Sequence, residues 1–260
     1  MKINIAPDAR PQVRTLLLAT LFSLALWFIP FAEIMTYPFR IFVTFIHEGG
    51  HALAAMLTGN EVHSLSISMN GSGEVYSTRG GLLSQLFVSS AGYLGAMAYG
   101  ALLLALIRRA FAARMVLIGS AGLVLTLTIA YGFFSPLMHG SIFSFFTMVA
   151  GAAIFFSLVA AARYASPRAA GFLVSFLAVQ CVLNALFDLK TVLFLSSPLA
   201  PAMPTDAANM AMATGIPSIF WSIFWIGAAF VILSLVLRTY SAKRRSPGQP
   251  DLPFEDSSEL

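Results

Sequence analysis

Residues 42–57 read FVTFIHEGGHALAAML, and this stretch decides how the rest of the chain is interpreted. The apolar residues on both sides of its polar centre predict a helix that is largely buried. Because residues four positions apart lie one above the other on a helix, the imidazoles of His47 and His51 can reach the same metal ion. The acid between them, Glu48, is placed to act on water at that ion. The stretch therefore predicts a metal-dependent catalytic site within an apolar helix.

The composition of the whole chain is that of a membrane protein. Of the 260 residues, 58% are hydrophobic and 10% are charged, whereas soluble proteins average about half apolar and a quarter charged residues. A membrane-spanning helix needs about 20 mostly apolar residues. The segments that meet this requirement are 14–36, 38–58, 82–107, 114–135, 141–162, 169–195 and 216–240. We therefore expect an α-helical, polytopic membrane protein with about seven transmembrane helices.

Basic residues mark the ends of these segments. They gather at 108–114, 163–168 and 238–245. No basic stripe is interleaved with aromatic residues, so nucleic-acid binding is not expected. Because positive charge is typical of the cytoplasmic side, we expect a cytoplasmic C-terminus. Seven spans would then place the N-terminus outside, although Lys2, Arg10 and Arg14 favour the inside, and one wrongly assigned segment would remove this conflict.

The two ends of the chain differ in character. The first apolar run, 15–35, is longer than the apolar part of a typical signal peptide and lacks a clear cleavage site, so we interpret it as a span. Residues 1–240 are expected to form one membrane-embedded domain. The last residues, 241–260, are basic and then acidic with several prolines, which predicts a disordered tail. The single cysteine, Cys181, excludes an internal disulfide and a cysteine-based zinc site.

A β-hairpin is predicted directly after the motif helix, near 62–78. Serine and apolar residues alternate from Ser64 to Met69, the turn signal Asn70-Gly71 follows, and residues 74–78 are again strand-like. Because only a short connection separates the hairpin from the motif helix, we expect the hairpin to lie beside the metal site.

Two histidines do not complete a catalytic zinc site, which takes three protein ligands and one open position. Asp188 is the only acid inside the later apolar segments, where ionisable side chains are usually functional. Asn184 lies on the same helical stripe. The nearby Lys190 fits the alternative that Asp188 is an ordinary acid at the membrane interface.

Asp206 is the rival for the third ligand position. It follows Pro204-Thr205 and precedes an alanine-rich run that ends at Gly215. This pattern is more simply interpreted as a short helix that Asp206 caps. We therefore favour a capping role for Asp206.

Several other residues have a structural interpretation. His63 and His139 are each isolated along the sequence from other candidate ligands, and we interpret them as loop or packing residues. The spacing of Gly92, Ala96 and Gly100 predicts close helix packing in lipid. Even the motif histidines have the alternative interpretation of buried side chains that hydrogen-bond to neighbouring helices.

The motif from Phe45 to Leu53, the hairpin after it and the run from Asn184 to Leu189 together resemble the site-2 protease family, and more narrowly its small bacterial peptidase-like branch. The members of this family are intramembrane zinc metallopeptidases. The resemblance implies that Zn²⁺ is the cofactor, with His47 and His51 as ligands, Glu48 as the catalytic acid/base and Asp188 as the third ligand. It implies for Asn184 a role in orienting the substrate or supporting the ligands.

The chain departs from the second motif of the family, which has an Asn, a Pro and a Leu-Asp-Gly run, because Asp188 lies four residues after Asn184 and precedes Leu189. No regulatory domain of the kind that larger members carry is expected. The family's chemistry nevertheless implies a multi-pass protein of the bacterial cytoplasmic membrane that hydrolyses peptide bonds in or near the transmembrane segments of its protein substrates.

A helical substrate must unwind before it is cleaved, and the edge of the hairpin could pair with the extended segment. The alternative from another class is a non-catalytic membrane protein that binds or escorts other membrane proteins. A transporter would need more polar residues along its spans than this sequence offers. Ligand type alone also leaves iron or cobalt possible in place of zinc.

Overall fold

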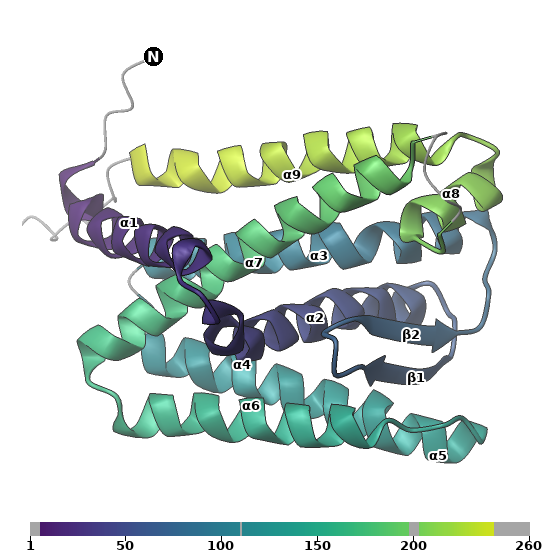
Figure 1. Ribbon diagram of the computed structural model, residues 1–260, viewed down its shortest axis with the longest axis horizontal. Helices are drawn as coiled ribbons and strands as arrows, with labels where there is room; N and C mark the ends of the chain where they lie inside the picture. Colours follow the sequence, from purple (N-terminus) through teal and green to yellow (C-terminus); the bar gives the residue numbers. More distant parts are fainter. Residues whose placement is uncertain (1–5, 110, 198–202, 242–260) are drawn as a thin grey trace, which may run out of the picture.

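The computed structural model describes residues 6–109, 111–197 and 203–241, which form a mostly helical structure with one small β-sheet (Figure 1). The elements are η1 Pro7–Ala9, α1 Arg10–Ala25, η2 Leu26–Phe28, α2 Ala32–Leu57, β1 Val62–Ile67, β2 Gly73–Ser77, α3 Leu82–Arg108, α4 Ala113–Leu127, η3 Thr128–Phe134, α5 Ser135–His139, α6 Phe145–Tyr164, α7 Pro167–Leu195, α8 Asp206–Thr214 and α9 Ser218–Ser241. Lys2 and the predicted disordered tail, apart from Ser241, lie outside the described residues.

Five helical segments of the described chain are long and apolar enough to cross a membrane. They are Leu82–Arg108, Ala113–His139, Phe145–Tyr164, Pro167–Leu195 and Ser218–Ser241. The α-helical class and the hairpin are confirmed, but the expected seven spans are not. α1 has only 16 residues, and α2 is interrupted by Arg40 and by the polar residues of the motif, which lower its hydropathy.

The segments that carry the three basic clusters meet at one end of the helix bundle (Figure 1). Arg108 at the end of α3 donates a hydrogen bond to the carbonyl oxygen of Thr239 in α9 at 3.0 Å. Arg114 of α4 donates to the carbonyl oxygen of Ala165, between α6 and α7, at 3.2 Å. All three predicted basic clusters therefore contribute residues to the same end of the molecule.

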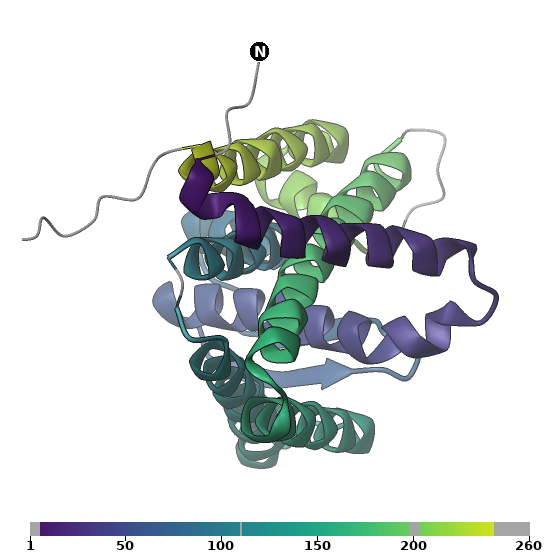
Figure 2. The same cartoon turned by 90° about the vertical axis from the view of Figure 1, so that its left-hand side faces the viewer.

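The described start of the chain lies at this basic end as well. The amide nitrogen of Ala6 donates to the carbonyl oxygen of Tyr240 at 3.1 Å, and Asp8 forms an ion pair with Arg108 at 2.9 Å. From there α1 runs across the end of the bundle instead of along it (Figures 1 and 2). The described start of the chain therefore lies beside the end of α9, and the first predicted span lies crosswise to the bundle.

Small residues allow α2 and α3 to cross closely. A Cβ atom at Gly50 of α2 would collide with the carbonyl group of Ala91 in α3, and a Cβ atom at Gly95 would lie 3.5 Å from the Cα atom of Gly50. Farther along α3, a Cβ atom at Gly100 would meet Val182 of α7 at 3.0 Å. The predicted packing role of the glycines in α3 is therefore confirmed at Gly100. Gly92 instead lies against the rings of the motif histidines.

The hairpin forms as predicted, with β1 and β2 antiparallel and in register from Ser64 opposite Tyr76 to Ile67 opposite Gly73. The outer edge of β1 is covered, because the amide nitrogen of Ile67 donates to the Thr147 hydroxyl of α6 at 2.7 Å. The turn contains Gly71 with φ +83°, a conformation that glycine adopts without strain.

Three side chains on one stripe of α2 hold the turn of the hairpin. The Tyr37 hydroxyl donates to the carbonyl oxygen of Met69 at 2.6 Å, Arg40 donates to that of Asn70, and Thr44 donates to that of Gly71 at 2.9 Å. We call these three α2 residues, Tyr37, Arg40 and Thr44, the hairpin clamp. Because they bind three consecutive carbonyl groups, the clamp fixes the hairpin against the helix that carries the histidine motif.

Candidate metal centre

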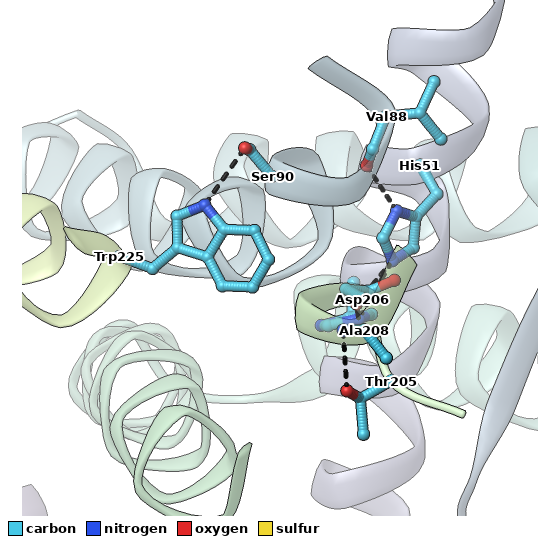
Figure 3. Close-up of polar contacts among 8 residues, drawn as sticks. His51, Val88, Ser90, Thr205, Asp206, Ala208 and Trp225 are labelled. Atoms are coloured by element: carbon cyan, nitrogen blue, oxygen red, sulfur yellow. Dashed lines mark hydrogen bonds and ion pairs between the residues drawn. The ribbon is translucent and has the colours of Figure 1, made fainter. Parts of the chain in front are cut away.

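The motif histidines lie on one face of α2 with their ring nitrogens close together. The Nε2 atoms of His47 and His51 are 3.1 Å apart. The Nδ1 atom of His51 lies 2.7 Å from the carbonyl oxygen of Val88 (Figure 3). A carbonyl oxygen can only accept, so Nδ1 carries a proton and Nε2 is the ring nitrogen that can bind a metal ion. Such a bond is the usual way in which a metal-binding histidine is held in the correct tautomer.

Asp206 at the first position of α8 completes the group. Its Oδ2 atom lies 3.4 Å from Nε2 of His51 and 3.7 Å from Nε2 of His47. The three ligand atoms lie within 4.8 Å of one another, an arrangement that could hold a metal ion. Asp188, the ligand expected from the sequence, does not belong to this group.

The capping role that the sequence suggested for Asp206 is performed by its neighbour. The short helix is present and ends at Gly215 with φ +75°. Its N-cap is Thr205, whose hydroxyl accepts a hydrogen bond from the amide nitrogen of Ala208 at 3.1 Å (Figure 3). Because Thr205 satisfies the helix terminus, the carboxylate of Asp206 is available to the histidines. A Thr directly before the acid was the sequence signal for this division of roles.

The electrostatic environment keeps Asp206 in the form that binds a metal. Burial by itself would raise the pKa of this carboxyl group, but without a metal ion the positive charge of protonated His51 and His47 outweighs burial and holds the pKa well below its usual value. The carboxylate is therefore negatively charged at neutral pH.

The distances among the three atoms fit a tetrahedral metal ion. Zinc ligands lie about 2.1 Å from the ion, which places any two of them roughly 3.4 Å apart in a tetrahedron. The observed separations of 3.1, 3.4 and 3.7 Å scatter around that value. Two imidazole nitrogens and one carboxylate oxygen are also a common ligand set of catalytic zinc, which leaves the fourth position open. The residues present therefore fit the ion that the sequence implies.

Residues of α3 and α9 pack around the motif histidines. A Cβ atom at Gly92 of α3 would collide with the Nε2 atoms of both histidines. Next to Gly92, the ring of Tyr93 contacts that of His47 with centroids 4.7 Å apart and that of Trp225 in α9 with centroids 5.5 Å apart. Trp225 itself is fixed, since its indole nitrogen donates to the Ser90 hydroxyl at 3.0 Å (Figure 3).

Glu48, the expected acid/base, is buried beside the histidines and faces the hairpin. Only 5% of its surface is exposed. A Cβ atom at Gly73 of β2 would lie 2.5 Å from its Oε1 atom. Glycine at the start of β2 therefore leaves the space that the carboxyl group occupies, and the hairpin lies beside the site as predicted.

The group borders a cavity of about 970 Å³ between the hairpin, α2, α7 and α8. Asp188 and Asn184 of α7 line this cavity with the histidines and Glu48. Asp188 is exposed there, and the amide nitrogen of the Asn184 side chain donates to the carbonyl oxygen of Gln180 at 2.8 Å. The structure thus places all of the predicted site residues around one cavity, but it brings Asp206 instead of Asp188 to the histidine pair.

Comparison with known proteins gives one family. A family model described as Peptidase M50B-like matches residues 16–236. Neither the comparison with curated proteins nor the comparison with solved structures gave a match. The matched range contains the histidine motif, the hairpin, Asn184, Asp188 and Asp206. Because it covers most of the chain, this protein belongs to the Peptidase M50B-like family and thus to the site-2 protease family.

Proposed function

We propose that this protein is an intramembrane zinc metalloprotease that hydrolyses peptide bonds in or near the transmembrane segments of membrane proteins. The observation that carries the proposal is the triangle formed by His47, His51 and Asp206, with the buried Glu48 next to it on the same helix. A protein that only bound metal for stability would fill the fourth ligand position, whereas this group borders a large cavity.

The chemistry divides between the ion and the protein. Zinc, when bound, supplies a Lewis acid that polarises the scissile carbonyl group and allows water to act as a nucleophile at neutral pH. Glu48 takes the proton of the attacking water and passes it to the leaving amine. The bond of His51 to the Val88 carbonyl oxygen keeps the ring oriented throughout the reaction.

The hairpin offers a place for an unwound substrate segment. The outer edge of β1 is covered by α6, while Gly73, Glu74 and Val75 of β2 line the cavity. A substrate that pairs with β2 would have its carbonyl groups satisfied outside its own helix, which lowers the cost of unwinding in lipid. This geometry supports substrate binding by addition of a strand to β2.

The test is to measure metal content and cleavage with the same preparations. The protein is purified in detergent, its zinc, iron and cobalt are quantified, and it is reconstituted with a single-span reporter protein that carries a central pair of glycines. We expect about one zinc ion per wild-type protein and cleavage within the reporter's span. Glu48→Gln should keep its zinc but lose cleavage on the order of 10²-fold or more, because proton transfer is removed while the ligands stay.

Three results would contradict the proposal. Folded wild-type protein without a divalent metal would exclude the metallopeptidase chemistry. Equal cleavage by the wild type and by Glu48→Gln would show that another enzyme or another residue is responsible. Zinc binding without any Glu48-dependent cleavage would favour the alternative of a non-catalytic protein that binds other membrane proteins.

A further inference from the structure

A second group of metal-ligating side chains lies outside the cavity, where β1 meets α5. Glu61 precedes β1, His63 lies in β1 and His139 ends α5, and one ligand atom from each lies within 4.8 Å of the other two. The sequence suggested that these histidines are isolated, but the fold brings them together. We propose that Glu61, His63 and His139 form a second, solvent-accessible site for a transition-metal ion, with Zn²⁺ as the best match.

His139 is already held in the form that binds a metal. Its Nδ1 atom lies 2.8 Å from the carbonyl oxygen of Ser135, one turn earlier in the same helix. The proton therefore resides on Nδ1, and the lone pair of Nε2 is free. That Nε2 atom lies 3.7 Å from Oε2 of Glu61, within the range that separates two ligands of one tetrahedral ion. The arrangement repeats the one that His51 makes with Val88.

His63 completes the set with a stacked ring. Its imidazole lies over that of His139 with centroids 4.4 Å apart and planes 13° apart. The edge of this stack is supported by Tyr76 of β2, whose ring centroid is 5.6 Å from that of His63. Because nearly parallel rings direct their lone pairs side by side, His63 must tilt to share an ion with His139. We therefore expect weaker binding here than at the His47–His51–Asp206 group.

The backbone beneath the three ligands is fixed without an ion. Glu61 and Thr78 exchange two hydrogen bonds of 2.9 Å, one to the Thr78 hydroxyl and one between the main chains. The Ser135 hydroxyl donates to the carbonyl oxygen of Val62, which joins α5 to the first residue of β1. The ligands are thus presented from segments that already hold each other, so little ordering is required when the ion binds.

The donor set determines the kind of ion. Two imidazoles and one carboxylate suit zinc, copper or nickel, whereas calcium and magnesium prefer oxygen ligands alone. An ion at this position would add a cross-link between the hairpin and the segment that continues α4.

The experiment measures zinc stoichiometry and affinity by competition with a chromophoric chelator in detergent. We expect two zinc sites in the wild type, with the weaker one lost or at least tenfold weaker in His63→Ala and in His139→Ala. Met138→Ala, at the exposed neighbour of His139, is the matched control and should keep both sites. His51→Ala should lose the tighter site and keep the weaker one.

These variants also separate the two metal proposals. If the catalytic proposal alone failed, the wild type would bind one zinc ion that depends on His63 and persists in His51→Ala. The second site would be excluded if His51→Ala bound no zinc at millimolar concentration, or if zinc binding in that variant were unchanged by adding His63→Ala and His139→Ala. Size-exclusion profiles matching the wild type would show that each variant is folded.

Discussion

Gly92 on α3 lies so close to His51 on α2 that any side chain at Gly92 would collide with the metal-facing Nε2 atom of that ring. Only glycine leaves enough space at this position for α3 to pass directly over the imidazoles of α2.

Gly92→Ala should weaken zinc binding at least tenfold without unfolding the protein, because the added methyl group turns the rings of His47 and His51 away from the shared ion. Zinc content and thermal unfolding are measured together. Gly119→Ala, on α4 with open space around the glycine, is the control and should keep its zinc. Full zinc occupancy in Gly92→Ala would mean that the rings do not bind the ion in the orientation described.

Two acids that line the same cavity, Asp206 and Asp188, are candidates for the third ligand, and one substitution at each distinguishes them. Asp206→Asn should lose most of the zinc, since the amide has no negative charge and is a poorer ligand than a carboxylate beside the two histidines. Asp188→Asn should retain its zinc, because this residue does not belong to the ligand group. The reverse pattern would restore the assignment that the resemblance implies.

Gly73→Ala tests the space beside the catalytic acid. The new methyl group would lie 2.5 Å from Oε1 of Glu48 and must displace either that carboxyl group or β2. We expect a reduction in cleavage of tenfold or more with zinc content unchanged, because no ligand is touched. Gly81→Ala, at the N-terminal boundary of α3 with nothing near its Cβ position, serves as the control. Unchanged cleavage in Gly73→Ala would show that cleavage does not depend on the position of the Glu48 carboxyl group.

Thr205→Val removes the cap of α8 while keeping the shape of the side chain. Loss of a capping hydroxyl costs about 1 kcal/mol, and here the frayed turn also carries Asp206. We therefore expect zinc to dissociate faster from Thr205→Val, whereas Thr205→Ser should behave as the wild type because it keeps the acceptor oxygen. Dissociation rates are measured with an excess of chelator, and identical rates in both variants would show that the cap does not position Asp206.

The hairpin clamp can be loosened one bond at a time. Thr44→Val removes the donor to Gly71, and Tyr37→Phe removes the donor to Met69; each net bond is worth about 1 kcal/mol. Hydrogen exchange of the turn should accelerate and cleavage should fall, with zinc content unchanged. Thr126→Val, whose hydroxyl bonds only within its own helix at 2.8 Å, is the control. Protection of the turn equal to the wild type in both clamp variants would contradict this role.

Local patterns predicted the parts of the structure that depend on near neighbours in sequence. The motif helix, the hairpin with its Asn70-Gly71 turn and the short helix ended by Gly215 all form where the sequence indicated. The number of spans was predicted less well. The hydropathy of the first segment shows that the segment is apolar. Hydropathy does not show whether a helix lies along the bundle or across its end.

The sequence by itself determined that His47 and His51 share a face with Glu48 beside them, because the pitch of a helix fixes the direction of side chains four residues apart. Only the tertiary structure decided which acid joins them. Asp206 reaches the histidines because α8 packs against α3, the helix that covers the motif, and because Thr205 takes over the cap. The meeting of His63 and His139 has the same cause, since contacts between distant segments depend on how the helices pack and leave no periodic pattern in the chain.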